Sequence, residues 1–332
     1  MTGPRTPSVW ELADLVTPMA VRVAATLRIA DHIAEGHRTA AAIAARAGTD
    51  PDTLDRLLRH LASVDLISRD PSGEHRLTEQ GEALRADHPS GVRARLDLEG
   101  AVGRADLAFV HLLDSVRSGQ PAYPLLFGQP FWDDLAGDPG RTRTYDAQMG
   151  TDVAAWASEV VPALDWGALG HVIDVGGGDG TLMAALLRAH PSLRGTVLDQ
   201  PATAETARTN LLAAGFGPRA DALAGSFFAP LPPGAGAYLL CAILHDWNDE
   251  AAREILLRCA DAAGPEGRIF VIEKTGADGE SPRSDHDLRM LVYFGGRERS
   301  ATELEALANT AELRRVALHP AGELTILELA AG

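Results

Sequence analysis

The spacing of hydrophobic residues divides the chain into two kinds of sequence. Up to about residue 165, apolar positions recur mostly at helical spacing, as with Leu54, Leu58 and Leu61. From about Leu169 to the C-terminus, short apolar runs alternate with helical segments. This alternation predicts an α/β domain on a largely parallel sheet. We therefore expect a helical N-terminal half followed by an α/β C-terminal half.

The first segment, residues 8–36, carries more apolar residues than one solvated helix needs. Ser8 is a candidate N-cap, and leucine, valine, isoleucine and methionine residues follow at close intervals. Part of this segment is therefore expected to be buried against a second copy of the chain. The prediction is a homodimer that forms through the N-terminal domain.

A helix, turn, helix and hairpin follow in that order. Residues 39–48 indicate a short helix that ends in glycine, and Asp50 is placed to cap a second helix over residues 51–63. Residues 66–78 contain two short apolar runs around Pro-Ser-Gly, which predicts a β-hairpin. This is the order of a winged-helix module. DNA-reading modules usually present a basic face, whereas this chain has a formal net charge of -16. The charge favours a dimerisation module, and no nucleic-acid partner is expected.

Strand-length apolar runs define the second half. They lie at residues 171–175, 195–199, 221–226, 236–244, 267–273, 314–319 and 324–329. Helices are predicted at residues 181–188, 250–263 and 302–311, with a further helix around Asp287 and Met290. Residues 92–162 look entirely helical.

We therefore predict three parts in the chain. They are a winged-helix dimerisation domain over residues 1–90, a helical linker and substrate cap over 91–165, and a Rossmann-like catalytic domain over 166–332.

The composition is that of an ordinary globular protein, with 45% hydrophobic and 23% charged residues among 332. The two cysteines, Cys241 and Cys259, lie in apolar segments, which favours reduced thiols and a cytoplasmic location. No apolar run approaches the length of a membrane span, and the N-terminus lacks a signal-peptide core. A membrane partner is therefore not expected.

The most informative stretch begins with the strand at residues 171–175. Three glycines, Asp179 and Gly180 follow directly, and a helix starts at Thr181. A strand, a glycine turn and a helix N-terminus bring bare backbone close to a ligand. The spacing is not the G-x-G-x-x-G of dinucleotide-binding proteins, and the lysine of a P-loop is missing. The next strand ends at Asp199, the position at which open α/β sheets bind a ribose diol.

Polar residues also end the later strands, and the carboxyl ends of parallel strands share one edge of a sheet. Together these positions are Gly176–Gly180, Asp199, Ser226 with Phe227, His245 with Asp246, and Glu273. His245 is the candidate general base, because an imidazole that titrates near neutrality can take a proton from a hydroxyl at working pH. Glu273 or Glu298 could orient its second nitrogen.

A metal site at the same position is disfavoured. Asp246, Asp249 and Glu250 follow His245, but the last two fall at a helix start, where acids are expected for capping. No second histidine lies at ligand spacing in the sequence. We therefore predict no metal.

The run at residues 172–180, Val-Ile-Asp-Val-Gly-Gly-Gly-Asp-Gly, resembles the S-adenosylmethionine-binding signature of class I methyltransferases. Together with residues 12–34, 225–232, 244–250 and 287–300, it makes nearly the whole chain similar to two-domain small-molecule O-methyltransferases. The most similar branch comprises bacterial polyketide-tailoring enzymes, including anthracycline 4-O-methyltransferases and related 10-hydroxylases. Related plant enzymes methylate phenylpropanoids and flavonoids.

This resemblance implies S-adenosylmethionine as the cofactor and an aromatic or polyketide hydroxyl as the methyl acceptor. It also implies His245 as the base, flanked by Glu273 and Glu298. Cofactor contacts are expected from Asp174, Gly176, Gly178, Asp199, Gln200, Ser226, Phe227, Asp246 and Trp247. Substrate contacts are expected from His111, Tyr145, Met149, Met290 and Phe294.

Departures from the family pattern leave other chemistry open. Plant-type relatives usually carry Asp where Ser226 stands, so the contact there is at best that of a hydroxyl. Some anthracycline-tailoring members lack the histidine, and a few bind the cofactor yet catalyse hydroxylation or decarboxylation. His245 favours methylation. The alternatives are a tailoring enzyme of such non-methyl chemistry and, less favoured, a winged-helix DNA-binding regulator.

Overall fold

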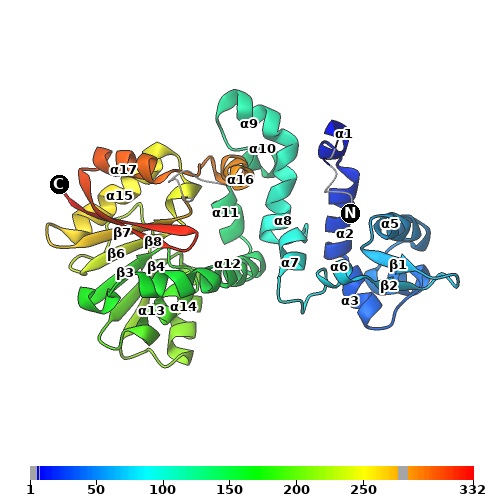
Figure 1. The fold of residues 1–332 in the computed structure, drawn as a ribbon, viewed down its shortest axis with the longest axis horizontal. Helices are drawn as coiled ribbons and strands as arrows, with labels where there is room; N and C mark the ends of the chain where they lie inside the picture. The colour runs from blue at the N-terminus through cyan, green and yellow to red at the C-terminus, as the bar shows by residue number, and fades with distance from the viewer. Residues whose placement is uncertain (1–5, 7, 276–282) are drawn as a thin grey trace. The chain divides into compact units, whose positions relative to one another are not determined.

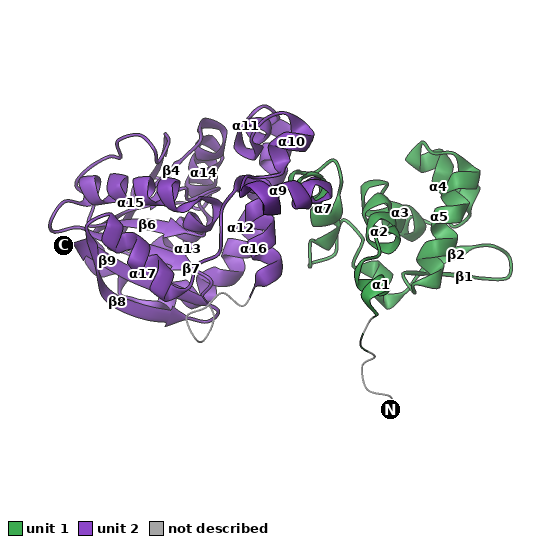
Figure 2. Cartoon of the chain, turned by 90° about the horizontal axis from the view of Figure 1, so that it is seen from above, with its two compact units in different colours: residues 1–107 green, residues 108–332 purple. Residues whose placement is uncertain are grey.

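The computed structural model describes residue 6, residues 8–275 and residues 283–332. The chain forms two compact units, residues 1–107 and residues 108–332 (Figure 2). The three-part division expected from the sequence stays a prediction. Among the described residues, no helix combines the length and the apolar character that a bilayer crossing requires.

Unit 1 consists of short helices and one β-hairpin. Its elements are α1 (Val9–Leu12), α2 (Val16–Thr26), α3 (Ile29–Ala34), α4 (Ala40–Ala47), α5 (Pro51–Ser63), β1 (Ile67–Arg69), β2 (His75–Leu77), α6 (Glu79–Glu82), α7 (Val92–Leu96) and α8 (Ala101–Asp106). The Asp50 side chain accepts a hydrogen bond from the Thr53 amide at 2.8 Å and caps α5 as predicted. β1 and β2 pair antiparallel with Ile67 opposite Leu77, which gives the predicted hairpin.

Helices α4 and α5 of unit 1 each bury one face, whereas α1 has no buried residue. Ile43 on α4 and Leu58 on α5 are fully buried in the core of the unit. On α1, by contrast, Val9 is 83% exposed, Trp10 84% and Leu12 71%. Large apolar side chains that gather at one exposed place mark an interaction surface.

Unit 2 is built on a mixed sheet. The strands are β3 (His171–Val175), β4 (Arg194–Asp199), β5 (Ala220–Ala224), β6 (Ala237–Cys241), β7 (Arg268–Glu273), β8 (Leu313–Ala321) and β9 (Leu324–Ala331). In the described residues they lie in the order β5-β4-β3-β6-β7-β9-β8. Neighbours from β5 to β7 pair parallel, while β9 is antiparallel to both β7 and β8. After β5 at one edge the chain returns to β6 beside β3, so the sheet has its topological switch point between β3 and β6. Ligands of open α/β sheets bind at such a point.

Helices cover both faces of this sheet (Figure 1). The helical elements are η1 (Leu107–His111), α9 (Leu112–Ser118), α10 (Tyr123–Phe127), α11 (Phe131–Ala136), α12 (Pro139–Val160), η2 (Val161–Ala163), η3 (Trp166–Leu169), α13 (Thr181–Ala189), α14 (Pro201–Ala213), η4 (Leu244–Asp246), α15 (Asp249–Ala263), α16 (Ser284–Phe294) and α17 (Ala301–Thr310). Side chains of β3 alternate between the two layers. Ile173 and Val175 join the core that contains residues of α15 and α17, whereas Val172 joins the core that contains residues of α13 and α14.

The strand predicted at residues 236–244 ends earlier than expected. β6 stops at Cys241, before its expected end at Leu244. Ala242 then adopts a left-handed φ of 54°, which takes the backbone out of the sheet. The Glu273 carboxylate at the end of β7 accepts a hydrogen bond from the Leu244 amide at 2.9 Å. The chain therefore turns over the end of β7 in η4 and carries His245 to the carboxyl edge of the sheet.

Candidate functional site

The loop after β3 is shaped by glycine. Gly176 has a φ of 75° and Gly178 a φ of 59°, a region that residues with a Cβ rarely adopt. A Cβ at Gly176 would also lie 2.5 Å from Cδ1 of Ile243. The Gly178 amide donates a hydrogen bond to the Asp199 carboxylate at 2.9 Å. The loop thus brings three of the predicted cofactor residues together at the ends of β3 and β4.

Two buried carboxyl groups lie beside this loop. Asp199 also accepts a hydrogen bond from the Gln200 amide at 2.7 Å, and burial raises its pKa. Asp174 is 1% exposed, and neither of its side-chain oxygens has a hydrogen-bond partner among the described residues. Burial and then the charge of Asp199 raise the pKa of Asp174 to about 7. A buried acid without a donor is unfavourable, so this place suits a ligand that brings donors or positive charge.

Helix α12 adds two residues that sequence reasoning missed. Asp146 is buried and accepts a hydrogen bond from the Thr203 hydroxyl at 3.0 Å. Burial raises the pKa of Asp146 to about 6. A Cβ at Gly150 would overlap the Asp179 carboxylate of the glycine loop. Glycine at this position leaves room for the Asp179 carboxylate where it lies, and no local pattern in the sequence signals a contact between such distant segments.

Aromatic residues border the other side of the loop. The Phe227 ring lies next to Gly176 and meets the Trp247 ring edge to face, with centroids 5.7 Å apart. Ser226, by contrast, is exposed, and its hydroxyl accepts a hydrogen bond from the Phe228 amide at 3.2 Å. Phe227 and Trp247 are therefore placed to offer apolar surface, while the Ser226 hydroxyl is engaged by its own turn.

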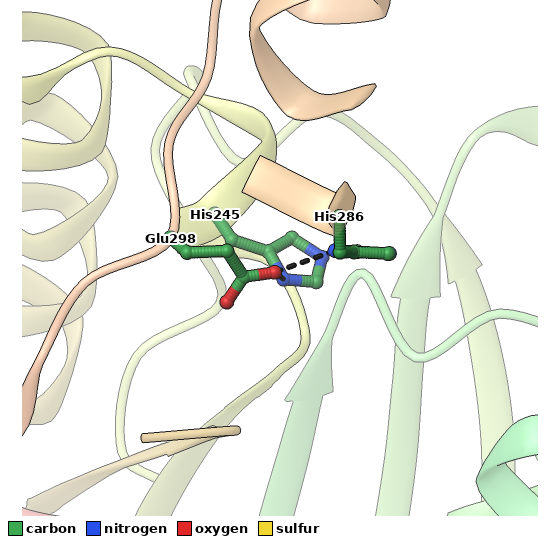
Figure 3. Close-up of side chains that lie close together, drawn as sticks. All are labelled: His245, His286 and Glu298. Atoms are coloured by element: carbon green, nitrogen blue, oxygen red, sulfur yellow. Dashed lines mark hydrogen bonds and ion pairs between the residues drawn. The ribbon is translucent and has the colours of Figure 1, made fainter. Parts of the chain in front are cut away.

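The imidazole of His245 lies among three carboxylates. Its Nδ1 atom is 3.2 Å from Oε2 of Glu273 and 3.5 Å from Oε1 of Glu298. Its Nε2 atom is 3.5 Å from Oδ1 of Asp246. Figure 3 shows the Glu298 carboxylate against the imidazole ring. Two acids thus hold Nδ1, and Nε2 is the nitrogen left to act on a ligand.

These carboxylates determine the charge of His245. Burial by itself lowers the pKa of an imidazole, but Glu273, Asp246 and Glu298 outweigh it and raise the pKa of His245 to about 10. Burial would raise the pKa of Glu298, yet the neighbouring histidines lower it to about 2. The carboxylates therefore favour the protonated form of the ligand-free His245, with a pKa above the near-neutral value expected from the sequence.

A second histidine, His286 on α16, also reaches this group. Its Nδ1 atom lies 2.5 Å from Oε1 of Glu298 (Figure 3). The Glu298 amide in turn donates to the Asp287 carboxylate at 2.8 Å. Sequence reasoning missed His286, because nothing in its spacing from His245 or Glu298 indicates that α16 and the following loop fold over η4.

The loop that carries His245 is fixed by Arg299, which is buried. The guanidinium donates to the Leu244 carbonyl at 2.7 Å and to the Trp247 carbonyl at 2.8 Å. It also donates to the Asp249 carboxylate at 2.8 Å. The loop backbone is therefore held in place in the ligand-free protein.

Helices α11, α12 and α16 contribute a cluster of rings that we call the aromatic wall, consisting of Phe131, Trp132, Tyr145 and Phe294. The Trp132 and Phe294 rings are stacked, with centroids 5.2 Å apart and planes at 10°. Tyr145 meets Trp132 edge to face at 5.7 Å, and Phe131 meets Phe294 at 4.9 Å. Burial, then the charges of nearby acids led by Asp246, raise the pKa of Tyr145, which places this ring close to the candidate site.

The remaining predicted substrate residues are placed differently. Met149 lies on α12 near Tyr145 in the chain and is half-buried, and Met290 is buried in α16. His111 pairs with Asp114 of its own helical segment at 3.1 Å, so the structure gives it a local partner rather than one in the aromatic wall. Trp132 was not among the predicted site residues.

Two family sequence models match the chain. The O-methyltransferase domain matches residues 109–314, and the O-methyltransferase dimerisation domain matches residues 10–87. The chain belongs to the O-methyltransferase family. This confirms the family that the sequence suggested and the predicted fold class, a helical dimerisation domain followed by a methyltransferase sheet.

Relatives of this O-methyltransferase resemble it along nearly their whole length. The 2,7-dihydroxy-5-methyl-1-naphthoate 7-O-methyltransferase of Streptomyces carzinostaticus is 54% identical over 320 residues, 96% of both chains. The aclacinomycin 10-hydroxylase RdmB of Streptomyces purpurascens is 42% identical over 95% of this chain and 86% of that protein. A crystal structure of the O-methyltransferase NcsB1 from neocarzinostatin biosynthesis, in complex with S-adenosylmethionine and 2-hydroxy-5-methyl naphthoic acid, has a TM-score of 0.95 and 52% identity, covering 99% of this chain and 100% of that one.

Proposed function

We propose that this O-methyltransferase moves a methyl group from S-adenosylmethionine to a hydroxyl group of an aromatic, polyketide-type compound. The observation that carries the proposal is His245, which two carboxylates hold at the same sheet edge as the glycine loop. The naphthoate methyltransferase and the NcsB1 complex support this cofactor and this substrate class.

The residues around the glycine loop fit S-adenosylmethionine. Asp199, at the tip of β4, offers a carboxylate to ribose hydroxyls. Asp174 and Asp146 are buried acids, and a cofactor with ammonium and sulfonium charges suits them. Phe227 and Trp247 offer apolar ring surface beside the loop. When bound, S-adenosylmethionine supplies an electrophilic methyl group on its sulfonium.

His245 is the general base in this proposal. Nε2 accepts the proton of the acceptor hydroxyl, while Nδ1–H faces Glu273 and Glu298 and so stabilises the imidazolium that forms. A positioned base of this kind contributes roughly 10²–10⁴-fold. Arg299 keeps the loop in the same conformation throughout, which limits the entropy lost when substrate is positioned.

The raised pKa of His245 links the base to occupancy of the cofactor site. Asp246 is among the carboxylates that raise it and is also a proposed cofactor contact. Once Asp246 neutralises a cation, it raises the pKa of His245 less. His245 then releases its proton more readily, so we infer that the base forms mainly in the cofactor-loaded enzyme.

The aromatic wall is proposed to hold the acceptor. The stacked rings of Trp132 and Phe294 offer flat apolar surface, which suits a fused-ring compound. The Trp132 Nε1 atom is buried and has no hydrogen-bond partner among the described residues. An oxygen substituent on the acceptor would satisfy this donor.

We also infer a homodimer through unit 1 and a cytoplasmic location. The exposed apolar side chains of α1 support the dimer, as does the match of residues 10–87 to a dimerisation domain. Both cysteines are free thiols, which agrees with a reducing compartment. The predicted lack of a nucleic-acid partner stays a prediction.

The test is product analysis with a hydroxynaphthoate as acceptor. Purified enzyme with S-adenosylmethionine should give a product that has gained one methyl group, and the His245→Ala variant should give far less. A product that has instead gained one oxygen would favour the alternative of non-methyl tailoring chemistry. If no fused-ring phenol is modified while S-adenosylhomocysteine still binds, the proposed acceptor class is wrong.

A further inference from the structure

The site contains more metal-ligating groups than proton transfer requires. His245, His286 and Glu298 each offer a ligand atom, and these atoms lie within 4.8 Å of one another (Figure 3). Two imidazoles and a carboxylate converging from separate segments are a donor set typical of zinc sites.

Glu273 lies beside this group of three and faces the same nitrogen of His245. Its Oε2 atom is 3.2 Å from Nδ1 of His245. The Glu273 side chain is nearly fully buried, and this oxygen has no hydrogen-bond partner among the described residues. The other oxygen, Oε1, is already occupied by the Leu244 amide. An unsatisfied buried carboxylate oxygen therefore points at the same nitrogen that faces Glu298.

We propose that His245, His286 and Glu298 form a binding site for a divalent transition-metal ion, with zinc as the best fit. We call these three residues the ligand cluster; the Glu273 carboxylate borders it. Two carboxylates balance the charge of a divalent cation, which reduces the repulsion between buried acids. Imidazole donors favour zinc, cobalt or nickel over magnesium or calcium.

The ligand atoms of the three residues lie within 4.8 Å of one another, so a zinc ion would require modest shifts of these side chains. Ligands about 2.0–2.1 Å from a tetrahedral zinc lie roughly 3.3 Å apart. The separations from Nδ1 of His245 to Glu273 and Glu298 are 3.2 and 3.5 Å. His286 and Glu298, at 2.5 Å, would have to move apart. The His286 side chain is 28% exposed, so it has room to move and gives an ion access from solvent.

Metal binding would disable the base, a consequence that rests on the proposed function. The bond to the metal forms at Nδ1 of His245, which must then lose its proton. From the imidazolium that proton goes to solvent, and from the neutral Nδ1–H form it ends on Nε2. In both cases Nε2 carries a proton and has no lone pair to accept one from the substrate hydroxyl. The metal would therefore act as an inhibitor.

Direct metal binding tests the site without reference to activity. The full-length enzyme, without a polyhistidine tag, would be titrated with zinc by calorimetry and with cobalt by visible absorption, which reports tetrahedral coordination. We expect one ion per chain, and binding at least about tenfold weaker in His286→Ala. His88→Ala is the matched control, because the half-buried His88 side chain lies in unit 1 and hydrogen-bonds Ser90 of its own turn. It should bind as the wild type does.

The conservative variant Glu298→Gln guards against misfolding, since it keeps the size of the side chain and removes one anionic ligand. It too should weaken zinc binding while unfolding at a temperature close to that of the wild type. Unchanged zinc affinity in both His286→Ala and Glu298→Gln would overturn the site and place the ion elsewhere, for instance on a cysteine. Failure to bind one ion per chain would overturn it as well.

A second arm measures methyl transfer in zinc, in magnesium, and in zinc followed by EDTA. Zinc should inhibit the wild type reversibly and magnesium should not. The zinc concentration for half inhibition should rise at least about tenfold in His286→Ala, each variant being compared with its own zinc-free rate. Stoichiometric zinc binding without inhibition would overturn Nδ1 of His245 as a ligand. If the wild type transfers no methyl group at all, the proposed function fails, and the binding arm alone decides the site.

Discussion

Two histidines, a buried one in unit 1 and a half-buried one in unit 2, show how differently the same side chain behaves. His75 on β2 of unit 1 is fully buried, and neither ring nitrogen has a hydrogen-bond partner among the described residues. Burial, and then the charge of Arg69, lower the pKa of His75. The His245 side chain of unit 2 is 15% exposed, and its carboxylate neighbours raise its pKa to about 10. Burial alone therefore does not decide protonation; the charges facing the ring do.

The two histidines should make stability depend on pH in opposite directions. His75 has a folded pKa below the unfolded value of about 6.5, so its contribution is complete above that pH and is lost as the pH falls. His245 has a folded pKa above the unfolded value. Its contribution is complete below about pH 6.5 and is lost as the pH rises towards 10.

The largest expected effect separates the two histidines by function. His245→Ala should lower turnover by about 10²–10⁴-fold at neutral pH, because the substrate hydroxyl loses its base. His75→Leu is the matched control and should leave turnover per folded molecule unchanged. Steady-state kinetics on a weakly acidic phenol would measure both. Equal rates for His245→Ala and the wild type would assign catalysis to proximity alone.

The loss in His245→Ala should also shrink as the pH approaches the phenol's own pKa of about 10, since a phenolate needs no base. For the wild type, kcat/KM should rise with pH above 6.5, because the ligand-free imidazole is protonated below its raised pKa. A rate that falls over this range would contradict the assignment of a cationic His245 in the ligand-free site.

Buried acids offer a second test, with a somewhat smaller effect. Asp199→Ala should weaken binding of S-adenosylhomocysteine by about 10–100-fold, because hydrogen bonds to a charged group contribute roughly 1.5–3 kcal/mol. The same ligand should raise the melting temperature of the wild type by mass action, and this shift should diminish in the variant. NAD should give no shift with either protein. A melting-temperature shift of full size in Asp199→Ala would show that Asp199 does not bind the ribose hydroxyls.

A stability prediction concerns His75 itself. His75→Leu should raise the free energy of unfolding by about 1–3 kcal/mol, because a buried polar group without partners is replaced by an apolar one. The gain should be larger at pH 5 than at pH 8. At pH 5 protonation of His75 favours the unfolded wild type, and the variant lacks this group. Chemical denaturation of both proteins at the two pH values would measure it. A gain of the same size at both pH values would show that the pKa of His75 does not change on folding.

The smallest expected effect would bring the pKa of His245 closer to that of His75. Glu273→Gln and Glu298→Gln each remove one negative charge beside the imidazole, so each should lower the pKa of His245. The pH at which kcat/KM rises should then move down, while the plateau rate falls less than in His245→Ala. A pH profile identical to that of the wild type in both variants would show that these carboxylates do not set the pKa of His245.

The parts of the site that the sequence could predict are those formed by one local segment. The glycine loop directly follows β3, Asp199 ends β4, and His245 follows β6 by four residues. A parallel sheet places these strand ends together. His286, Asp146 and Trp132 lie on helices, and only the packing of those helices brings them to the site. Spacing along the chain detects only ligands that lie on one element. It therefore could not indicate the second histidine near His245, which lies on another element. The early end of β6 depends on a hydrogen bond from Leu244 to Glu273, which no pattern of apolar residues can show.

Arg299 has a consequence for how this enzyme could diverge. It donates to two main-chain carbonyls of the His245 loop, those of Leu244 and Trp247, which are present whatever side chains the loop carries. Replacing His245 or Asp246 would therefore leave the guanidinium's main-chain anchors in place and the backbone path intact. Mutations there could change the reaction without unfolding the protein, so the residues between the two anchors are where new chemistry could arise in this lineage. Arg299 itself, which holds the loop and is not a proposed substrate contact, should be the harder residue to change.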